Sequence, residues 1–283
     1  MTSRRGDRQP EEAGPPGVQR DGRLRPLGRK VAALVIAVAL LAGVIGGGLL
    51  VRGLATGGPP PGPKTAAIVD QLSLTVANPD FVASATGLLE EAGYTVDYYS
   101  GEQVSVDFYR GLPTHDYDLI ILRVHSGITI ERDAASGEKT QTEYVSLFTG
   151  EPYAETAYRD EQDEGRLAEA VYYEGASPLF AITPDFVKYS MGGRFDDTLI
   201  VAMGCDGLRS QRTAQAFLDK GASAFVSWSL PVSASHTDAA TQRLLEKLFV
   251  QELTVQAAVV QAGAEVGPDP SYGARLRVLT DGE

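Results

Sequence analysis

Cysteine is almost absent from this sequence, with one residue, Cys205, in 283. A single cysteine excludes an intramolecular disulfide framework and any metal site built from several thiolates. Histidine is also scarce: there are three, without an HExxH pattern or a paired ligand spacing, which argues against a zinc site. The glycine-rich patterns that bind dinucleotides or nucleoside triphosphates are missing too. We therefore expect neither a metal nor another cofactor.

Positive charge is sparse outside the N-terminal quarter of the chain. The whole sequence has a net charge of −12, but residues 1–64 carry +6 and residues 65–283 carry −18. An acidic body disfavours nucleic acid as a partner, because binding a phosphate backbone requires a basic surface. Most of these carboxylates are expected to form a solvated surface.

The N-terminal quarter divides by composition. Residues 1–30 are polar, rich in Arg, Pro and Gly, and typical of a disordered tail. Residues 31–51 contain no charge and are long enough to cross a bilayer core of about 30 Å. Residues 52–64 form a Pro/Gly linker, and a globular domain is expected over 65–283.

The basic residues precede the apolar run, so the positive-inside rule predicts a cytoplasmic N-terminus and an extracellular domain. The expected location is the cell membrane, with a single pass through residues 31–51. A signal cleaved near Ala55 and a buried core helix are the alternatives. The sequence does not indicate an oligomeric state.

Strand and helix patterns alternate through the domain, which predicts an α/β fold with a mainly parallel sheet flanked by helices on both faces. The apolar runs predict strands at 66–69, 94–99, 117–124, 179–183, 198–203, 222–228 and 274–279. Helices are predicted at 79–92, 104–110, 163–172, 184–191, 210–220, 237–251 and 255–266. A hairpin is expected between 129–133 and 139–147.

Two of the most apolar predicted strands end in reactive residues, His125 and Cys205. If these strands are parallel neighbours, their C-terminal ends lie on one edge, where ligands collect in open α/β sheets. A histidine beside a cysteine can act as base and later as acid while the thiolate attacks a carbonyl. The backbone amides of Ser126, Gly127 and Cys205 could stabilise the oxyanion.

Each of these residues also has a simpler interpretation. A lone cysteine at a strand end is often an inert, small hydrophobic residue. His115 lies in a loop and is expected at the surface, and His236 near a helix start is expected to be structural or exposed. A redox sensor is a poor alternative, because Cys205 has no resolving partner.

The order of these motifs resembles the caspase-like cysteine peptidases, a group that includes caspases, gingipains and CHAT domains. The resemblance covers the region from about Thr65 to the C-terminus and is closest at 125–127 and 199–262. It implies a three-layer sandwich with His125 as general acid or base, Cys205 as nucleophile, and an oxyanion hole at the turn after His125. It also implies that the strand after the cysteine lines the substrate pocket, here with Trp228 and Ser229.

Two departures from the family pattern are visible. Ser126 stands where caspases have glycine, although a backbone amide serves with either residue. Asp206 follows Cys205 directly, and a nearby carboxylate would raise the pKa of the thiol.

These observations predict a membrane-anchored cysteine endopeptidase that hydrolyses a peptide or protein substrate. The alternative is a catalytically inactive caspase-like domain that binds peptides or proteins outside the cell. Asp206 is a further candidate for substrate binding. The acidic segment 151–164 would favour Arg or Lys in the substrate, unless it is simply solvated.

Overall fold

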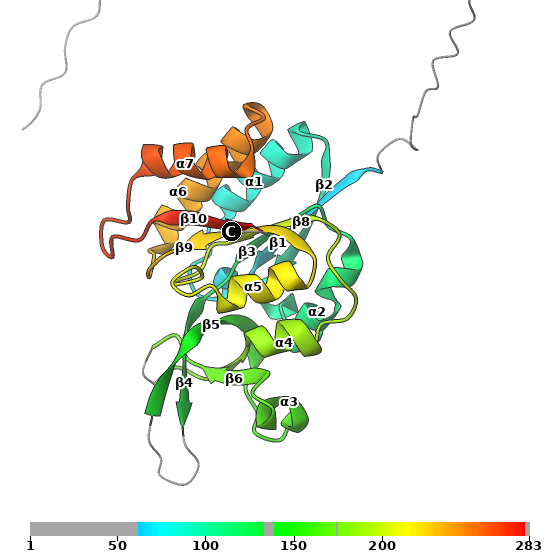
Figure 1. Cartoon of the computed structure of the whole chain (residues 1–283), viewed down its shortest axis with the longest axis vertical. Coiled ribbons are helices and arrows are strands. Elements are labelled where there is room, and N and C mark those ends of the chain that lie inside the picture. The colour runs from blue at the N-terminus through cyan, green and yellow to red at the C-terminus, as the bar shows by residue number, and fades with distance from the viewer. Residues whose placement is uncertain (1–61, 133–138, 174, 281–283) are drawn as a thin grey trace, which may run out of the picture. The chain divides into compact units, whose positions relative to one another are not determined.

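The computed structural model describes residues 62–132, 139–173 and 175–280. A six-stranded sheet in the order β10-β9-β8-β3-β1-β2 runs through the domain (Figure 1). Its strands are β1 (Lys64–Asp70), β2 (Tyr94–Ser100), β3 (Leu119–Arg123), β8 (Thr198–Ala202), β9 (Ala222–Trp228) and β10 (Leu276–Thr280). All neighbours are parallel except β10, which is antiparallel to β9. The prediction of a mainly parallel sheet is confirmed.

The burial of the strands explains their sequences. All five residues of β3 are buried, as expected for a central parallel strand with helices on both faces. β2 lies at the edge of the sheet and alternates between half-buried and exposed residues over its first four positions. An uninterrupted apolar run therefore marks the centre of the sheet, and alternation marks its edge.

Helices cover both faces of this sheet (Figure 1). On one side, α1 (Pro79–Glu91), α6 (Ala234–Leu245) and α7 (Val255–Val266) bury Ile68, Ile121, Val201 and Val226. On the other side, α2 (Val106–Gly111), α4 (Pro184–Tyr189) and α5 (Arg212–Asp219) bury Ile120, Leu122, Ile200 and Phe225. Short 3₁₀ turns lie at η1 (Gln71–Leu74), η2 (Gly101–Gln103) and η3 (Leu112–His115), and a π-helical turn, η4 (Glu246–Val250), continues α6. The prediction of helices on both faces is also confirmed.

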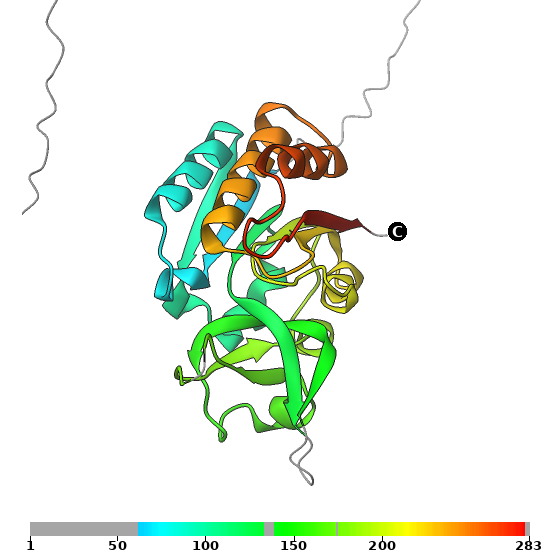
Figure 2. The same cartoon turned by 90° about the vertical axis from the view of Figure 1, so that its left-hand side faces the viewer.

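A second, four-stranded antiparallel sheet extends from the first one (Figure 2). Its order is β4-β5-β7-β6, with β4 (Ser126–Arg132), β5 (Lys139–Pro152), β7 (Leu179–Ile182) and β6 (Leu167–Ala170). β4 and β5 form the predicted hairpin, whose turn lies outside the described residues. Only Val124 and His125 separate β3 from β4, so the two sheets meet at the candidate site.

The predicted helix over residues 163–172 is wrong. The helix in this region, α3, spans Arg159–Asp163 and is followed by Gly165 in a left-handed conformation with φ of 69°. The residues after Gly165 form β6, which pairs antiparallel with β7. Pairing with a partner strand 9 to 15 positions further along the chain decides the structure here, and local sequence does not contain that information.

The described residues contain no helix that combines the length and the apolar composition required to cross a bilayer. The apolar run at 31–51, predicted to be transmembrane, lies outside the described residues.

Candidate functional site

His125 and Cys205 follow neighbouring parallel strands. The register pairs Leu122 with Ala202, and the amide of Met203 donates to the Leu122 carbonyl at 2.9 Å. Past the strand ends the two segments stay close, because the Ser126 hydroxyl donates to the Cys205 carbonyl at 2.6 Å. The structure thus brings the backbones of positions 125 and 205 together at the carboxyl edge of the sheet.

Gly204 makes this close approach possible. A Cβ atom at Gly204 would lie 2.2 Å from the Ser126 hydroxyl and 2.5 Å from the Val124 carbonyl oxygen. At Gly207 a Cβ would lie 2.2 Å from the hydroxyl of Ser227 on β9. The turn that carries Cys205 therefore packs closely against the segment after β3 on one side and against β9 on the other. Glycine fits at positions 204 and 207 because it has no Cβ atom.

The His125 side chain sits among aromatic rings. Its ring centre lies 4.6 Å from that of Tyr172 and 5.9 Å from that of Phe148. Its Nε2 makes a 2.9 Å hydrogen bond with the Thr75 hydroxyl, just after η1. Burial, followed by the positive charge of Arg123, lowers the pKa of His125 to about 4. The imidazole is therefore neutral at pH 7.

Gln71 links the backbone of His125 to the ring that covers its side chain. The Gln71 side-chain carbonyl accepts the His125 amide at 2.9 Å, and its NH₂ group donates to the Tyr172 hydroxyl at 2.6 Å. Gln71 is fully buried. The side chain of Gln71 thus holds both the main chain of His125 and the Tyr172 ring that contacts its imidazole.

The Cys205 thiol lies against the segment between β9 and α6. Its Sγ donates to the Val232 carbonyl at 3.6 Å and accepts the Val232 amide at 3.5 Å. Burial raises the pKa of the thiol, and the charges of Asp206 and Asp269 raise it further, against the lowering effect of the Val232 amide. The thiol is therefore protonated at pH 7.

Asp206 has unusual surroundings for a carboxylate. It is 6% exposed, its φ is 61°, and its Oδ1 makes no hydrogen bond within the described part of the chain. The nearest positive charge is Arg209, whose Nη1 lies 3.6 Å from Oδ1. Burial raises the pKa of Asp206, while Arg209 lowers it. The carboxylate that directly follows Cys205 is thus buried, with Arg209 as its charged neighbour.

The candidate oxyanion donors differ in direction. The Phe148 amide donates to the His125 carbonyl at 2.9 Å, and the register pairs Gly127 with Ser146. Hydrogen bonding alternates along an antiparallel ladder, so the Gly127 amide faces β5 and the Ser126 amide faces away from it. The alternation therefore favours Ser126 as a donor on the open edge.

Trp228 and Ser229 occupy structural positions. Trp228 is 1% exposed, and its indole donates to the Thr237 hydroxyl, which itself donates to the Met203 carbonyl at 2.9 Å. The Ser229 amide donates to the Arg275 carbonyl, and the Ser229 hydroxyl accepts the Arg275 amide, both at 3.1 Å. The buried Trp228 ring is therefore linked through Thr237 to Met203, two positions before Cys205.

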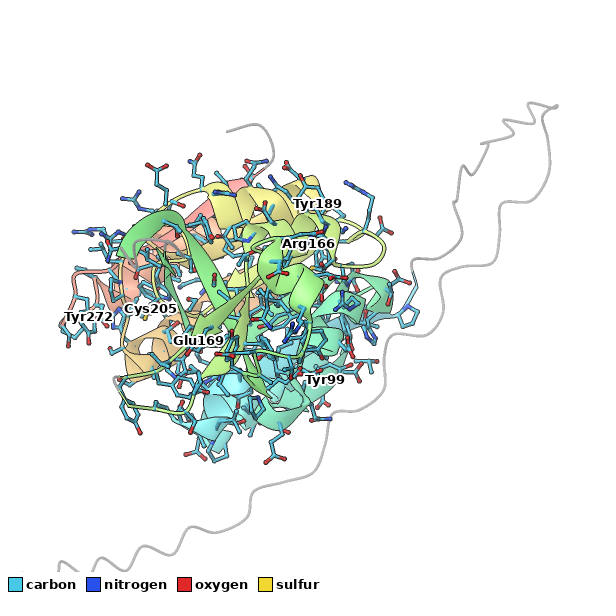
Figure 3. The ribbon with its side chains drawn as sticks, turned by 90° about the horizontal axis from the view of Figure 1, so that it is seen from below. Tyr99, Arg166, Glu169, Tyr189, Cys205 and Tyr272 are labelled. Carbon is cyan, nitrogen blue, oxygen red and sulfur yellow. The ribbon has the colours of Figure 1, made fainter. Side chains whose placement is uncertain are left out.

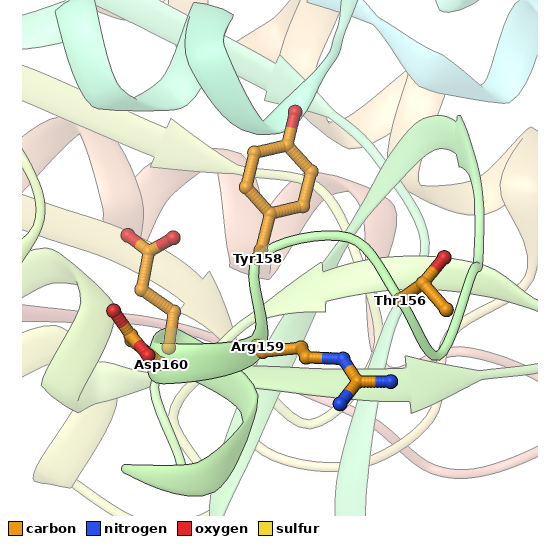
Figure 4. A pocket seen from close by; sticks show the side chains of 5 residues that line it. Thr156, Tyr158, Arg159 and Asp160 are labelled. Carbon is orange, nitrogen blue, oxygen red and sulfur yellow. The ribbon is translucent and has the colours of Figure 1, made fainter.

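Part of the acidic segment is already paired within the domain. Glu161 accepts two hydrogen bonds from Arg110 at 2.6 and 3.2 Å, and Glu164 forms an ion pair with Arg166. Glu151 accepts the amide of Val106 at the start of α2. A hollow at α3 is lined by Thr156, Tyr158, Arg159, Asp160 and Glu161 (Figure 4). This pairing reduces the charge that remains for a substrate.

The other two histidines make different contacts. His115 is exposed and its ring stacks on Tyr117, whereas His236 contacts from α6 the ring of Trp228, a residue of the cluster against which Cys205 packs. Within the described ranges, no group of three or more potential ligand side chains could hold a metal ion.

Figure 3 shows Cys205 and Tyr272 on one side of the domain and Tyr99 on the other.

Sequence reasoning missed the residues that surround His125, namely Gln71, Thr75, Tyr172 and Arg123. Arg123 alone left a signal, because it is a charged residue directly within a buried apolar strand. The other three are ordinary polar or aromatic residues in irregular segments. Nothing in their local sequence points to a histidine.

In comparisons with known proteins, the chain matches no protein-family model, and no curated protein is significantly similar to it in sequence.

Proposed function

We propose that this domain is a cysteine endopeptidase of the caspase-like kind, with Cys205 as nucleophile and His125 as general base and acid. The observation that carries the proposal is the meeting of these two positions at the carboxyl edge of the sheet, tied by the 2.6 Å hydrogen bond from Ser126 to the Cys205 carbonyl. This edge is where open α/β sheets bind ligands.

The protonation states suit acyl transfer from a neutral pair. A low pKa keeps His125 neutral, and a raised pKa keeps the Cys205 thiol protonated. As Sγ attacks the scissile carbonyl carbon, its proton passes to the imidazole. The imidazolium then protonates the leaving amine as the C–N bond breaks. A water molecule, deprotonated by His125, finally cleaves the thioester to release the acid and restore the thiol.

We also propose which atoms take part. Because Nε2 of His125 is bonded to Thr75, Nδ1 is the nitrogen left to exchange a proton with the thiol. The thiol must leave its contacts with Val232 to reach the imidazole, and we propose that substrate binding brings about this shift. The Ser126 amide serves as an oxyanion donor, together with the amide of Cys205.

We further propose the finer structural and cellular assignments: a caspase-like three-layer sandwich, anchored in the cell membrane by residues 31–51 and facing outward. The substrate is a peptide or protein with Arg or Lys before the cleaved bond. The support for this preference is the negative charge of Asp206, which directly follows the nucleophile and acts on its thiol. Ser229 is the other residue proposed to border the substrate, with Trp228 beneath it.

The test is hydrolysis of a mixed peptide library by the full chain in a non-ionic detergent. We expect wild type to cleave, and Cys205→Ala and His125→Ala to lose cleavage. His115→Ala is the matched control, because it removes an exposed histidine and should retain the wild-type rate. Cleavage that persists in Cys205→Ala would contradict the proposal.

A second candidate, an inactive domain that binds peptides, is favoured by one observation. The thiol makes both its hydrogen bonds with Val232, and burial raises its pKa. In this case the full chain would bind library peptides without cleaving them. Binding would then be equal in wild type and Cys205→Ala.

A further inference from the structure

Arg123 is the last residue of β3 and is fully buried at the centre of the sheet. Its Nη1 donates to Asp70 at 2.7 Å, and its Nε and Nη2 donate to the two oxygens of Asp238 at 2.8 and 3.0 Å. Nη2 also donates to the Val76 carbonyl at 2.9 Å. Every nitrogen of this guanidinium therefore has an acceptor.

A buried ion pair of this kind is a weak source of stability. Desolvation of the charges offsets much of their attraction, and apolar replacements of similar volume are often neutral or stabilising. The presence of Arg123 in an otherwise apolar strand therefore points to a role in fixing geometry. The planar fork of arginine suits that role, because it sets the direction of each bond.

The partners of Arg123 show which geometry is fixed. Asp70 and Val76 are the two ends of one short segment, and Arg123 binds both ends. Within this segment, Gln71 holds the backbone of His125 and Thr75 holds its ring. The two residues of this segment that bond His125 are thus each the immediate neighbour of a residue held by Arg123.

The carboxylates are themselves held in place by other elements. The Asn78 side chain donates to Asp238 at 2.8 Å, and the Tyr98 hydroxyl donates to Asp70 at 3.1 Å. Arg123 and its partners, which we call the Arg123 clamp, therefore connect β1, β2, β3, α6 and the start of α1. Arg123 ends β3 two positions before His125.

We propose that Arg123 is a positioning residue, which orients the His125 imidazole by clamping both ends of the segment 70–76. Its effect on catalysis rests on the function proposed above, whereas its effect on the orientation of His125 does not.

The test compares Arg123→Lys with Arg110→Lys in the full chain in non-ionic detergent. Lysine keeps the charge at either position but loses the fork. Arg110 is the matched control, because it also donates two hydrogen bonds to a carboxylate, that of Glu161, but from α2. The rate of Cys205 alkylation by a peptidyl acyloxymethyl ketone, which occupies the proposed substrate site, is measured from pH 6 to 10.

At neutral pH the protonated thiol depends on His125, so Arg123→Lys should slow alkylation about tenfold or more, as His125→Ala does. As the pH rises, more of the thiol ionises unaided, so the rate of Arg123→Lys should approach that of wild type toward pH 10. Arg110→Lys should follow wild type throughout. Equal rates in Arg123→Lys and wild type at pH 7 overturn the inference. A loss of equal size at pH 7 and pH 10 overturns it as well, since it shows general damage.

If Arg123→Lys shows no cooperative unfolding transition, Asp238→Asn replaces it. This variant keeps the shape of the clamp but weakens the hold on two guanidinium nitrogens. It should slow the reaction at pH 7 in the same direction by several-fold. An unchanged rate again overturns the inference.

Nuclear magnetic resonance separates this inference from the peptidase proposal. With the imidazoles isotope-labelled, Arg123→Lys should move the resonances of His125 but not those of His115 and His236, and Arg110→Lys should move none. Unmoved His125 resonances overturn the positioning role. If instead they move while wild type and His125→Ala alkylate at the same rate, the positioning role stands and the peptidase proposal falls.

Discussion

Acidification should destabilise this domain through one half-buried residue, His125. Its pKa in the folded protein is about 4, below the ordinary value of 6.5. The unfolded chain therefore binds a proton at His125 in a range of pH where the folded chain does not. The resulting contribution to stability is complete above pH 6.5 and is lost as the pH falls toward 4.

The size of the effect follows from the two pKa values. Between pH 7 and pH 5, the unequal proton binding by His125 lowers the free energy of unfolding by about 2 kcal/mol. By pH 4 the loss reaches about 3 kcal/mol. In between, the slope is close to one proton per molecule, or about 1.4 kcal/mol per pH unit.

The assay is urea unfolding of the full chain in detergent, followed by the fluorescence of the single, buried Trp228. His125→Gln removes the titrating group while leaving an amide that can still bond Thr75. Other titrating groups are common to both proteins, so the difference between wild type and variant isolates His125. His115→Gln is the control and should parallel wild type.

We expect the free energy of unfolding of wild type, relative to His125→Gln, to fall by about 2 kcal/mol from pH 7 to pH 5. A difference that stays constant over this range would refute the reasoning. It would show that water reaches the imidazole and that His125 titrates near its ordinary pKa.

Three further substitutions test the surroundings of the thiol, and a fourth, Gly87→Ala, is a control. Gly204→Ala should lower the unfolding free energy by about 1–3 kcal/mol, because the added Cβ would lie 2.5 Å from a backbone carbonyl oxygen. Gly87→Ala should instead raise it by about 0.5–1 kcal/mol, because Gly87 lies within α1 with open space around it. Asp206→Asn should speed iodoacetamide alkylation of Cys205 several-fold at pH 7, because a charge that raises the thiol pKa is removed. Thr237→Val should cost about 1–3 kcal/mol in urea unfolding and shift the tryptophan emission, because its hydroxyl bonds both the indole and a buried carbonyl.

The main sheet could be predicted because its strands are marked by local sequence. Apolar runs identify β3 and β8, and a helix connects β1 with β2 and β8 with β9, which is typical of parallel pairing. The antiparallel sheet of β4 to β7 could not be predicted in the same way. Residues 167–170 are compatible with a helix in isolation, and only their pairing with β7 makes them a strand.

The surroundings of the candidate site depended even more on distant contacts. The prediction that His125 and Cys205 follow strand ends needed only the apolar runs before them. Arg123, by contrast, finds Asp238 across 115 positions of sequence, and Gln71 meets the His125 amide across 54. Such contacts arise only after the sheet has formed, so periodicity and motif spacing do not reveal them.

The most direct test of the central claim is the covalent modification of the full chain by a peptidyl acyloxymethyl ketone with a basic residue next to the ketone. Intact mass and peptide mapping locate and count the label. The proposed chemistry predicts one saturable label per chain, on Cys205, that is lost in His125→Ala at pH 7. Slow labelling of equal rate in wild type and His125→Ala would contradict it.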